Sequence, residues 1–383
     1  MSQAVNIPRQ VARGVNSCAE FSAAIEEHDT YVRGGYTEVQ DREALLSETF
    51  CSDEASALLF ANGMAAIGTV LRTLLKAGDQ VVASDTLYVH SRILLKQLAE
   101  NWGVQVVFID PTDQKALRAA VTDQTKVIFT EVIGNGFTMP VADLETMTQL
   151  VSGNPQILLV IDNTLLGPTL FNPWFHFNES IPRNQVVVVE SCTKYYGLGN
   201  IGQGGVIYAT NCWIDKLWKQ RTVDGSIMQP SVLAQWPAYT LEQMAERMRC
   251  HSEHAYNLAV LLSAHKNDVQ EVNHPSLPEH PDHQRRVGQY GFPGCGGVLY
   301  VKIRGGAEAA MRFADGYAEA MGLPLIMTSF GHEQTTVFPL AVYREYFPED
   351  LWGVVLIAAG YNRPMGLEQS AEAFRQALAH ISP

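Results

Sequence analysis

Between residues 57 and 210, short apolar runs alternate with segments whose apolar residues recur at helical spacing. This alternation is typical of a mostly parallel sheet with helices on its faces. The pattern predicts helices over residues 64–76, 91–101 and 144–152. It predicts seven strands, over residues 57–60, 80–83, 104–109, 126–131, 157–162, 186–190 and 205–209. We therefore expect one large α/β domain over residues 51–235.

The two ends of the chain follow different patterns. Residues 1–50 are polar and irregular, and we interpret them as an arm that contacts another surface. Residues 233–266 carry no strand signal and predict a long helix. This helix leads into a smaller C-terminal α/β domain, residues 236–383. That domain is expected to hold strands over 297–303 and 334–342 and a final helix over 368–381.

Composition narrows the class of protein. The chain has 383 residues, of which 46% are apolar and 17% charged, as is ordinary for a globular fold with a large core. Its formal net charge of −13 argues against binding to nucleic acid or to an anionic membrane, although a local pocket can still take a small anion. Six cysteines without CxxC pairs fit a reducing compartment, and no metal site is expected. No apolar stretch is long enough for a signal sequence or a membrane span, so we expect a cytoplasmic protein.

Candidate chemistry first appears at Lys194. The apolar run 186–190 is followed at once by Ser191-Cys192-Thr193-Lys194. Open α/β sheets bind ligands at the carboxyl ends of their strands, where a partly desolvated amine has a lowered pKa and becomes nucleophilic. The hydroxyls of Ser191 and Thr193 are available to an anion. Taken alone, Lys194 is more simply a surface lysine after a strand, so other signals are needed.

Two further strand ends carry suitable groups. Asp162 closes an apolar strand, where a carboxylate can hold a protonated nitrogen heterocycle or simply cap the next element. Gly63 and Met64 stand where a strand meets a helix, and the free N–H groups of a helix N-terminus bind phosphate. With Tyr88 and Lys194, these residues supply what pyridoxal 5′-phosphate (PLP) needs: a Schiff-base lysine, a pyridinium partner, a ring stack and a phosphate site.

The sequence resembles the Cys/Met-metabolism family of fold-type I PLP-dependent enzymes, which includes cystathionine γ-lyase, cystathionine γ-synthase and methionine γ-lyase. The resemblance runs from about residue 31 to the C-terminus. It implies a fold-type I architecture with PLP as cofactor. It also implies a homo-oligomer, either a dimer or a homotetramer built as a dimer of dimers, that acts on a small amino acid.

By this resemblance, Lys194 forms the covalent link to PLP, Asp162 pairs with the pyridinium nitrogen and Tyr88 lies on the ring face. Lys194 and Tyr88 are then the catalytic residues that move protons. Four residues hold the phosphate, two through backbone N–H groups and two through hydroxyls: Gly63, Met64, Ser191 and Thr193.

Two more motifs match the family. Glu131 is followed four residues later by Asn135, as in the family, and this places Asn135 near the cofactor's phenolic oxygen. Tyr31 and Arg33 match the family's Tyr-x-Arg, which reaches the phosphate of the neighbouring subunit. The resemblance thus gives the polar N-terminal arm a function.

The same alignment shows departures at the substrate side. Aligned on Gly360, the family's arginine that clamps the substrate's α-carboxylate falls on Leu356. Either Arg363 has taken over the clamp or the carboxylate is bound in another way, and Arg363 can also be an ordinary surface residue. The family's Ser-Leu-Gly-Gly becomes Ser329-Phe330-Gly331-His332, in which Ser329 is a candidate substrate contact.

The resemblance favours a lyase that uses PLP to eliminate a γ-substituent from an L-amino acid. Changes around Tyr88, Asn200 and Leu356 favour an unusual substrate over cystathionine or methionine. Candidates are a halogenated or unsaturated amino acid, such as a chloro-allylglycine that gives an alkyne amino acid, or canavanine.

Two other functions are open. A γ-replacement synthase of the cystathionine γ-synthase or O-acylhomoserine sulfhydrylase type uses the same set of residues. A non-catalytic PLP-binding relative is a remote third interpretation, because such a protein has no need to keep both Lys194 and Asp162.

Overall fold

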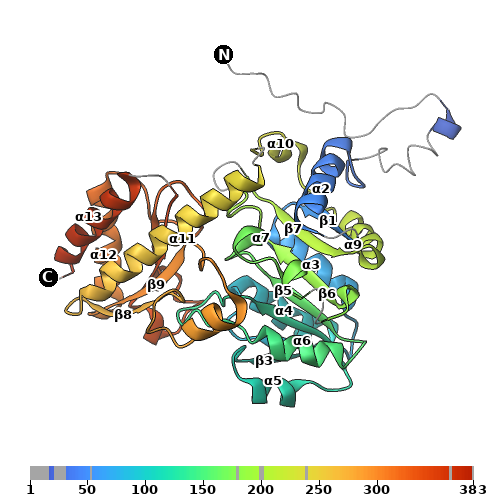
Figure 1. Cartoon of the computed structure of the whole chain (residues 1–383), viewed down its shortest axis with the longest axis horizontal. Coiled ribbons are helices and arrows are strands. Elements are labelled where there is room, and N and C mark those ends of the chain that lie inside the picture. The colour runs from blue at the N-terminus through green and yellow to red at the C-terminus, as the bar shows by residue number, and fades with distance from the viewer. Residues whose placement is uncertain are drawn as a thin grey trace.

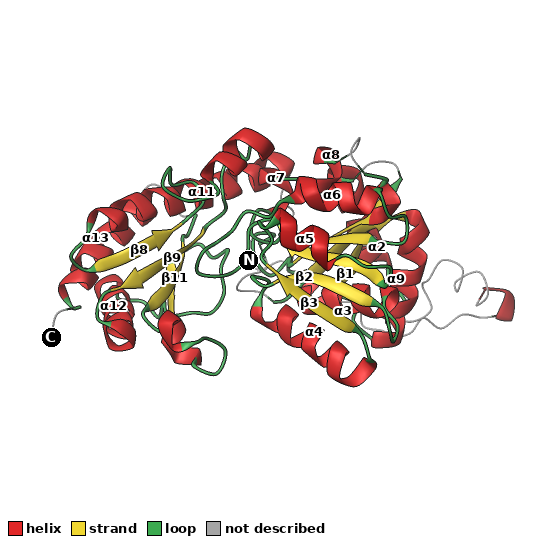
Figure 2. Cartoon of the chain, turned by 90° about the horizontal axis from the view of Figure 1, so that it is seen from below, coloured by secondary structure: helices red, strands yellow, loops and turns green. Residues whose placement is uncertain are grey.

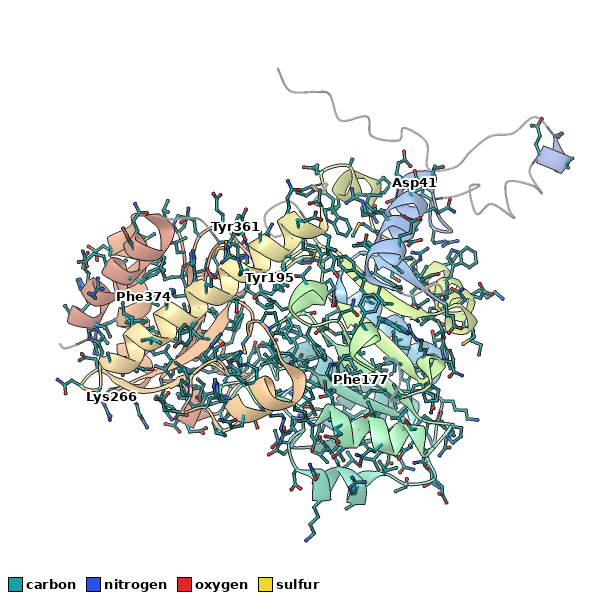
Figure 3. The ribbon with its side chains drawn as sticks, viewed as in Figure 1. Asp41, Phe177, Tyr195, Lys266, Tyr361 and Phe374 are labelled. Carbon is teal, nitrogen blue, oxygen red and sulfur yellow. The ribbon has the colours of Figure 1, made fainter. Side chains whose placement is uncertain are left out.

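The computed structural model describes residues 17–20, 32–51, 54–177, 181–197, 202–237, 240–361 and 365–381. These residues form two α/β bodies, each with its own sheet, and helix α11 (Leu241–Ala264) leads from the larger body into the smaller one (Figure 1). Tyr195 and Tyr361 lie near the junction of the two bodies (Figure 3). None of the helices within these ranges is both long and apolar enough to cross a bilayer.

The larger body is built on a seven-stranded sheet in the order β1-β7-β6-β5-β4-β2-β3. Only β7 runs antiparallel to its neighbours, and the other strand pairs are parallel. The predicted strands and the α/β class are therefore confirmed, because apolar runs buried on both faces mark the strands of a parallel sheet. The strands are β1 (Ala55–Phe60), β2 (Gln80–Ser84), β3 (Gln105–Ile109), β4 (Thr125–Glu131), β5 (Leu158–Asp162), β6 (Val186–Glu190) and β7 (Gly205–Thr210).

Helices cover both faces of this sheet. Successive residues of one strand point to opposite faces, so they pack against different sets of helices. Leu58 of β1 belongs to the cluster under α3 (Gly63–Leu74), α4 (Val89–Trp102) and α9 (Asn211–Asp224). Leu59 belongs to the cluster on the opposite face. Figure 2 shows α4 and α6 on opposite sides of the sheet. The opposite face carries α2 (Thr37–Phe50), α6 (Leu144–Ser152), α7 (Gly167–Leu170) and α8 (Pro173–His176), while α5 (Gln114–Ala120) follows β3.

The smaller body holds an antiparallel sheet in the order β10-β11-β9-β8. The pattern predicted β9 and all of β10, but it missed β8, β11 and α12. The expected strand 334–342 ends early at Pro339, and a 3₁₀ helix, Leu340–Tyr343, follows. The elements are β8 (Val269–Asn273), β9 (Val298–Ile303), α12 (Gly306–Met321), β10 (Thr336–Pro339), β11 (Val354–Ala358) and α13 (Met365–Ala379).

The expected single helix over 233–266 is wrong at its start. Residues Pro230–Leu233 form a separate short helix, α10, and α11 begins only after Thr240. The Thr240 side chain accepts a hydrogen bond from the Gln243 backbone N–H, and the Gln243 side chain accepts one from the Thr240 backbone N–H. This reciprocal pair is a capping box, which satisfies donors that the first helical turn leaves open.

Close contacts tie the smaller body to the segment that carries Lys194. The backbone N–H of Gly297 donates to the Tyr195 hydroxyl at 2.8 Å. Gly331 has a positive φ of 85°, and a Cβ there would lie 2.4 Å from the carbonyl oxygen of Lys194. Only glycine fits at Gly331, because a side chain is excluded by both the backbone conformation and the space.

The expectation of an irregular arm is wrong for residues 37–50, which form helix α2. This helix is anchored by Glu43, whose carboxylate accepts a hydrogen bond from the Leu59 N–H at 2.7 Å and forms an ion pair with Arg221. Arg221 lies on α9, is 1% exposed, and also donates to the Leu59 carbonyl at 2.8 Å. Burial raises the pKa of Glu43, although the Arg221 charge opposes that shift. Helices α2 and α9 are thus joined through β1.

We expect Arg221→Met to lower the free energy of unfolding by about 3–5 kcal/mol, because it leaves a buried carboxylate without its counter-charge. Urea unfolding followed by circular dichroism measures the change. Arg249→Met is the matched control. The ion pairs of Arg249 with Glu246 and Glu253 are exposed, so this variant should lose about 0–1 kcal/mol of stability. Equal stability of the two variants would show that the buried pair does not anchor α2.

Candidate active site

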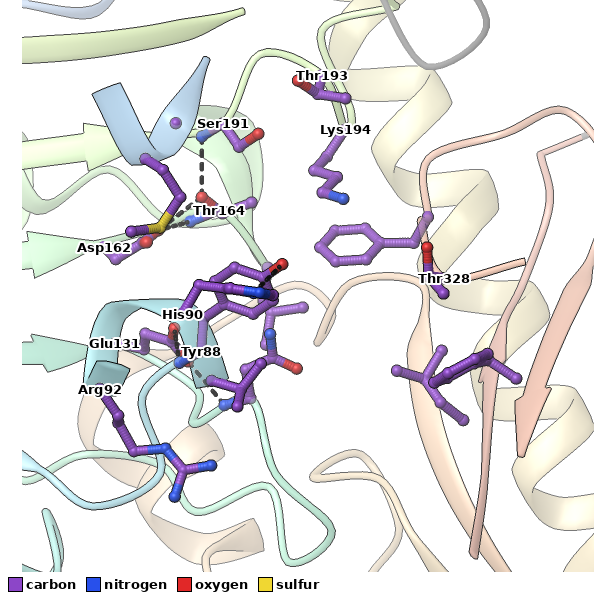
Figure 4. Close-up of a pocket in the computed structure, with 18 of the residues that line it drawn as sticks. Tyr88, His90, Arg92, Glu131, Asp162, Thr164, Ser191, Thr193, Lys194 and Thr328 are labelled. Atoms are coloured by element: carbon purple, nitrogen blue, oxygen red, sulfur yellow. Dashed lines mark hydrogen bonds between the residues drawn. The ribbon is translucent and has the colours of Figure 1, made fainter. Parts of the chain in front are cut away.

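A cavity of about 470 Å³ lies where the carboxyl ends of β4, β5 and β6 face the smaller body. Its floor comes from the large sheet and from the first turns of α3 and α4, and its opposite wall comes from β9, β10, β11 and the residues between β10 and β11. This is the position at which open α/β sheets bind ligands. Figure 4 shows Lys194, Asp162, Glu131 and Tyr88 around this space.

Lys194 follows β6 through a tight turn in which its backbone N–H donates to the Ser191 carbonyl. Its Nζ donates to the Ser329 hydroxyl at 2.9 Å and lies 4.7 Å from the centre of the Phe330 ring. Burial lowers the pKa of Lys194 to about 8, although the Asp162 charge opposes this shift. The structure thus brings together Lys194 and Ser329, two predicted site residues that are far apart in the sequence.

Asp162 ends β5, where its Oδ1 accepts hydrogen bonds from both the backbone N–H and the hydroxyl of Thr164. The Thr164 hydroxyl oxygen in turn accepts the Ser191 N–H at 2.9 Å, which links the end of β5 to the start of the lysine turn (Figure 4). Burial raises the pKa of Asp162, while Thr164 and the Lys194 charge favour the ionised form. A carboxylate held in this way can bind a cationic nitrogen.

Glu131 lies beside Asp162, because the two residues are register partners on β4 and β5. Glu131 Oε1 accepts the Tyr88 N–H at 2.8 Å, and Oε2 accepts the Asn135 N–H at 2.7 Å. Burial first and the Asp162 charge second raise the pKa of Glu131 well above its ordinary value. Glu131 therefore fixes the two segments that carry Tyr88 and Asn135.

A second contact holds Asn135, whose Oδ1 accepts the Tyr300 hydroxyl at 2.8 Å. Tyr300 lies on β9 of the smaller body, so this bond joins the two sides of the cavity. The sequence analysis did not select Tyr300, and nothing distinguishes it from the other aromatic residues of a buried strand.

The N-terminus of α3 presses closely on the lysine turn. Asn62 caps the helix by accepting the Ala65 N–H at 2.8 Å. A Cβ at Gly63 would lie 2.9 Å from Ser191 Cβ, and one at Gly205 would lie 2.4 Å from the Asn62 carbonyl oxygen. Glycine at 63 therefore lets the helix N-terminus meet the Ser191 segment across a space that a side chain would fill. This cradle fits an anionic group such as a phosphate.

The hydroxyl groups predicted to bind an anion belong to Ser191 and Thr193. Ser191 and Thr193 both line the cavity. The Thr193 hydroxyl donates to the Gly204 carbonyl at 3.3 Å and accepts the Gly204 N–H at 3.1 Å, so it also braces the strand that follows.

Eight of the predicted cofactor residues line this one cavity, and Ser329 reaches the same site through its hydrogen bond to Lys194. Arg33 lies elsewhere in its own chain, with its Cδ near Gly225 at the end of α9. Its contact with a neighbouring subunit stays a prediction. Tyr31, Asn200 and Arg363 lie outside the described residues. The eight are Gly63, Met64, Tyr88, Asn135, Asp162, Ser191, Thr193 and Lys194.

Leu356 lines the cavity from the middle of β11, between its register partners Phe338 on β10 and Tyr300 on β9. Phe330 belongs to the same apolar wall, which Leu340, Tyr343, Tyr346 and Phe347 extend. The sequence analysis identified Leu356 by alignment but missed the rest of this wall. The expected strand 334–342 includes the first of these residues, whereas the chain leaves β10 at Pro339 and residues within 340–347 line the cavity.

A family model for Cys/Met metabolism PLP-dependent enzymes matches residues 5–342. The chain belongs to this family. It is 28% identical over 284 residues to cystathionine gamma-lyase from Bos taurus, which covers 71% of this chain and 67% of the bovine one. It is 31% identical over 277 residues to a probable cystathionine gamma-synthase from Herpetosiphon aurantiacus, which covers 72% of this chain and 82% of that relative.

A solved structure supports the fold. The crystal structure of metB from Corynebacterium glutamicum matches with a TM-score of 0.82 at 24% identity, over 99% of this chain and 92% of that one. PLP is the cofactor of the family, and the cavity fits it. The cavity offers a lysine amine, a carboxylate at a strand end and a glycine-lined helix N-terminus on one sheet edge.

We expect the rate at which the apoprotein combines covalently with PLP to rise with pH through a midpoint of about 8, because the neutral Lys194 amine is the reactive form. Borohydride trapping at timed intervals, quantified by mass, measures this rate. Asp162→Asn should move the midpoint to lower pH, since the Asp162 charge stabilises the ammonium form. Lys266→Ala is the surface control and should leave the midpoint unchanged. A wild-type midpoint above pH 10 would contradict the assignment.

Proposed function

We propose that this protein is a PLP-dependent lyase that eliminates an uncharged γ-substituent from an L-amino acid. A halogenated or unsaturated amino acid, such as a chloro-allylglycine converted to an alkyne amino acid, is the substrate class we favour. The observation that carries this choice is the apolar wall around Leu356, which stands where the family's sequence pattern puts an arginine.

The cavity has two chemically different halves. Asp162, Ser191 and Lys194 give the floor its polar groups. A cofactor held by these groups would leave the wall from the smaller body to contact the substrate. On that wall Phe338, Leu340 and Leu356 present apolar side chains to the cavity. Burying an unpaired polar or charged group against such a surface costs several kcal/mol. Cystathionine carries a second ammonium and carboxylate beyond Cγ, and canavanine carries a basic group there, so both fit this wall less well than a small uncharged substituent.

The proposed reaction assigns each side chain a task. When bound, PLP supplies the electron sink that stabilises negative charge on the amino acid's carbon atoms. Asp162 keeps the ring nitrogen protonated through its carboxylate. The Lys194 amine removes the proton from the substrate's Cα, as its lowered pKa allows near neutral pH. Tyr88 stands at the opposite rim, where its phenol exchanges a proton with the substrate's carbon chain, while a departing halide leaves as the anion.

A γ-replacement synthase is the second candidate, favoured by the similarity to the probable cystathionine gamma-synthase of Herpetosiphon aurantiacus. Such an enzyme must admit a second, nucleophilic substrate to Cγ. The two reactions differ in their products: elimination consumes the amino acid alone, whereas replacement needs an added thiol and joins it to the carbon chain.

A substrate panel tests the proposal. We expect turnover of γ-halogenated and unsaturated amino acids to exceed that of cystathionine, canavanine and O-succinylhomoserine by at least tenfold in kcat/KM, with methionine as the uncharged sulfur reference. Mass spectrometry of the products, halide release and ammonia release give the reading. Cystathionine as the best substrate would refute the choice of substrate. A thioether product formed only with added thiol would establish the synthase.

Leu356→Arg should raise kcat/KM for every L-amino acid that the enzyme converts. By the family resemblance, an arginine at this position pairs with the α-carboxylate that all these substrates share, which adds about 1.5 kcal/mol or more of binding, or roughly tenfold. Leu356→Met keeps the volume and the apolar character, so its kcat/KM values should stay within about twofold of the wild type. Unchanged kcat/KM values in Leu356→Arg would show that this position does not face the substrate's carboxylate.

The assignment of Lys194 has a direct test. Borohydride reduction of the holoenzyme followed by peptide mapping should place the pyridoxyl mass on Lys194, and Lys194→Ala should show no reduced adduct. Label on another lysine would refute the active-site assignment, whatever the substrate.

A further inference from the structure

Tyr88 and His90 form a contact at the rim of the cavity that the proposed reaction does not yet use. His90 Nδ1 lies 3.0 Å from the Tyr88 hydroxyl oxygen, and the two ring centres are 5.2 Å apart. On its other side, the His90 ring lies 5.6 Å from the ring of Tyr346. The imidazole therefore sits between two phenols, and both His90 and Tyr88 line the cavity (Figure 4).

The start of α4 produces this geometry. Residues two apart in a helix do not face each other, but Tyr88 precedes the helix, with ψ at 136°. Its backbone N–H is fixed by Glu131 Oε1, so the position of the phenol is set from the strand below. His90, in the first turn of α4, then meets the phenol from the solvent side. The contact thus follows from local chain geometry held by a buried carboxylate.

We propose that His90 is the proton partner of the Tyr88 phenol. A neutral imidazole accepts the phenolic hydrogen at Nδ1, whereas a protonated one donates from Nδ1 to the phenol oxygen, so one hydrogen bond serves both states. When the phenol gives its proton to the substrate's carbon chain, the O–H bond of Tyr88 breaks and a C–H bond forms. The proton on His90 Nδ1 then moves to the phenol oxygen, which leaves the imidazole neutral. Water replaces the lost proton at the exposed imidazole.

Charged and titratable groups around the pair explain why Tyr88 needs a partner. Glu131 lies beneath it on β4, Arg92 follows on α4, and Tyr343 and Tyr346 face it from the smaller body, with Lys194 across the cavity. Burial first, and then Glu131 and the two tyrosines, raise the pKa of Tyr88. A phenolate at this position is thus costly, and a proton must return quickly. Imidazole is the side chain that both gives and takes a proton near neutral pH.

The first experiment needs neither cofactor nor substrate, so its outcome is independent of the proposed reaction. The apoprotein is labelled with 13C at the tyrosine Cζ, and the Tyr88 signal is assigned by its loss in Tyr88→Phe. We expect this signal to change with pH, because the imidazole either accepts the phenolic hydrogen at Nδ1 or donates from it to the phenol oxygen. His90→Phe should abolish this change. His265→Asn, at the far end of α11, is the control and should leave it intact. A Tyr88 signal that titrates identically in His90→Phe would overturn the proposal.

The second experiment separates proton transfer from positioning in the holoenzyme. With the best substrate of the panel, His90→Phe should lower kcat at pH 7 by about tenfold to a hundredfold and leave KM within threefold, since general acid–base groups contribute 10²–10⁴-fold. His90→Asn keeps a hydrogen-bonding atom near Nδ1 but cannot carry a proton. It should show the same loss in kcat and also lose the corresponding limb of the pH profile. Full rescue of kcat by Asn would show that His90 only positions Tyr88, which overturns the proposal.

Discussion

The site depends on two carboxylates, Glu131 and Asp162, that are buried side by side because β4 and β5 are parallel and in register. Neither can be left without partners in the sheet interior, since an uncompensated buried charge is strongly destabilising. Each meets this demand differently. Glu131 binds two backbone N–H groups and so fixes the rims that carry Tyr88 and Asn135. Asp162 binds Thr164 and remains the carboxylate that faces Lys194.

The rest of the cavity is arranged around this pair. Thr164 is hydrogen-bonded to Asp162, and its hydroxyl oxygen accepts the Ser191 N–H at the start of the turn that carries Lys194. The position of Asp162 therefore also fixes that turn. Asn135, whose backbone is held by Glu131, accepts the hydroxyl of Tyr300 on the smaller body and so connects Glu131 to that body. The carboxylates therefore do more than supply charge: they set the relative positions of three strand ends and of one strand from the opposite sheet. The hydrogen bonds that the two buried carboxylates need are thus the same bonds that hold the active-site segments in place.

Much of the fold and of the polar floor could be predicted from the sequence. The central strands β5 and β6 of the large sheet are buried on both faces, so their apolar runs are unambiguous, and the chemistry at Asp162 and Lys194 falls at or directly after the ends of these runs. Prediction failed where long-range contacts outweigh local pattern. Helix α2 has polar residues along most of its length and is held by the buried pair Glu43 and Arg221, a partnership that no local pattern reveals. The wall over residues 340–347 depends on the chain leaving β10 at Pro339, which apolar periodicity does not signal.

The smaller body contacts the turn that carries Lys194 at Gly331 and Gly297, and this contact makes some positions of the chain much less tolerant of substitution than others. Gly331 is packed on the carbonyl of Lys194, and a Cβ at Gly297 would lie 3.1 Å from the Tyr195 hydroxyl, so both positions resist substitution. The segment from Leu340 to Phe347 lies on the other side of the cavity and makes no comparable backbone contact with that turn among the described residues. Mutations there can alter which molecules enter without disturbing the reactive amine. In evolution, and in laboratory selection, a chain built this way can diversify its substrates while its underlying chemistry stays constant.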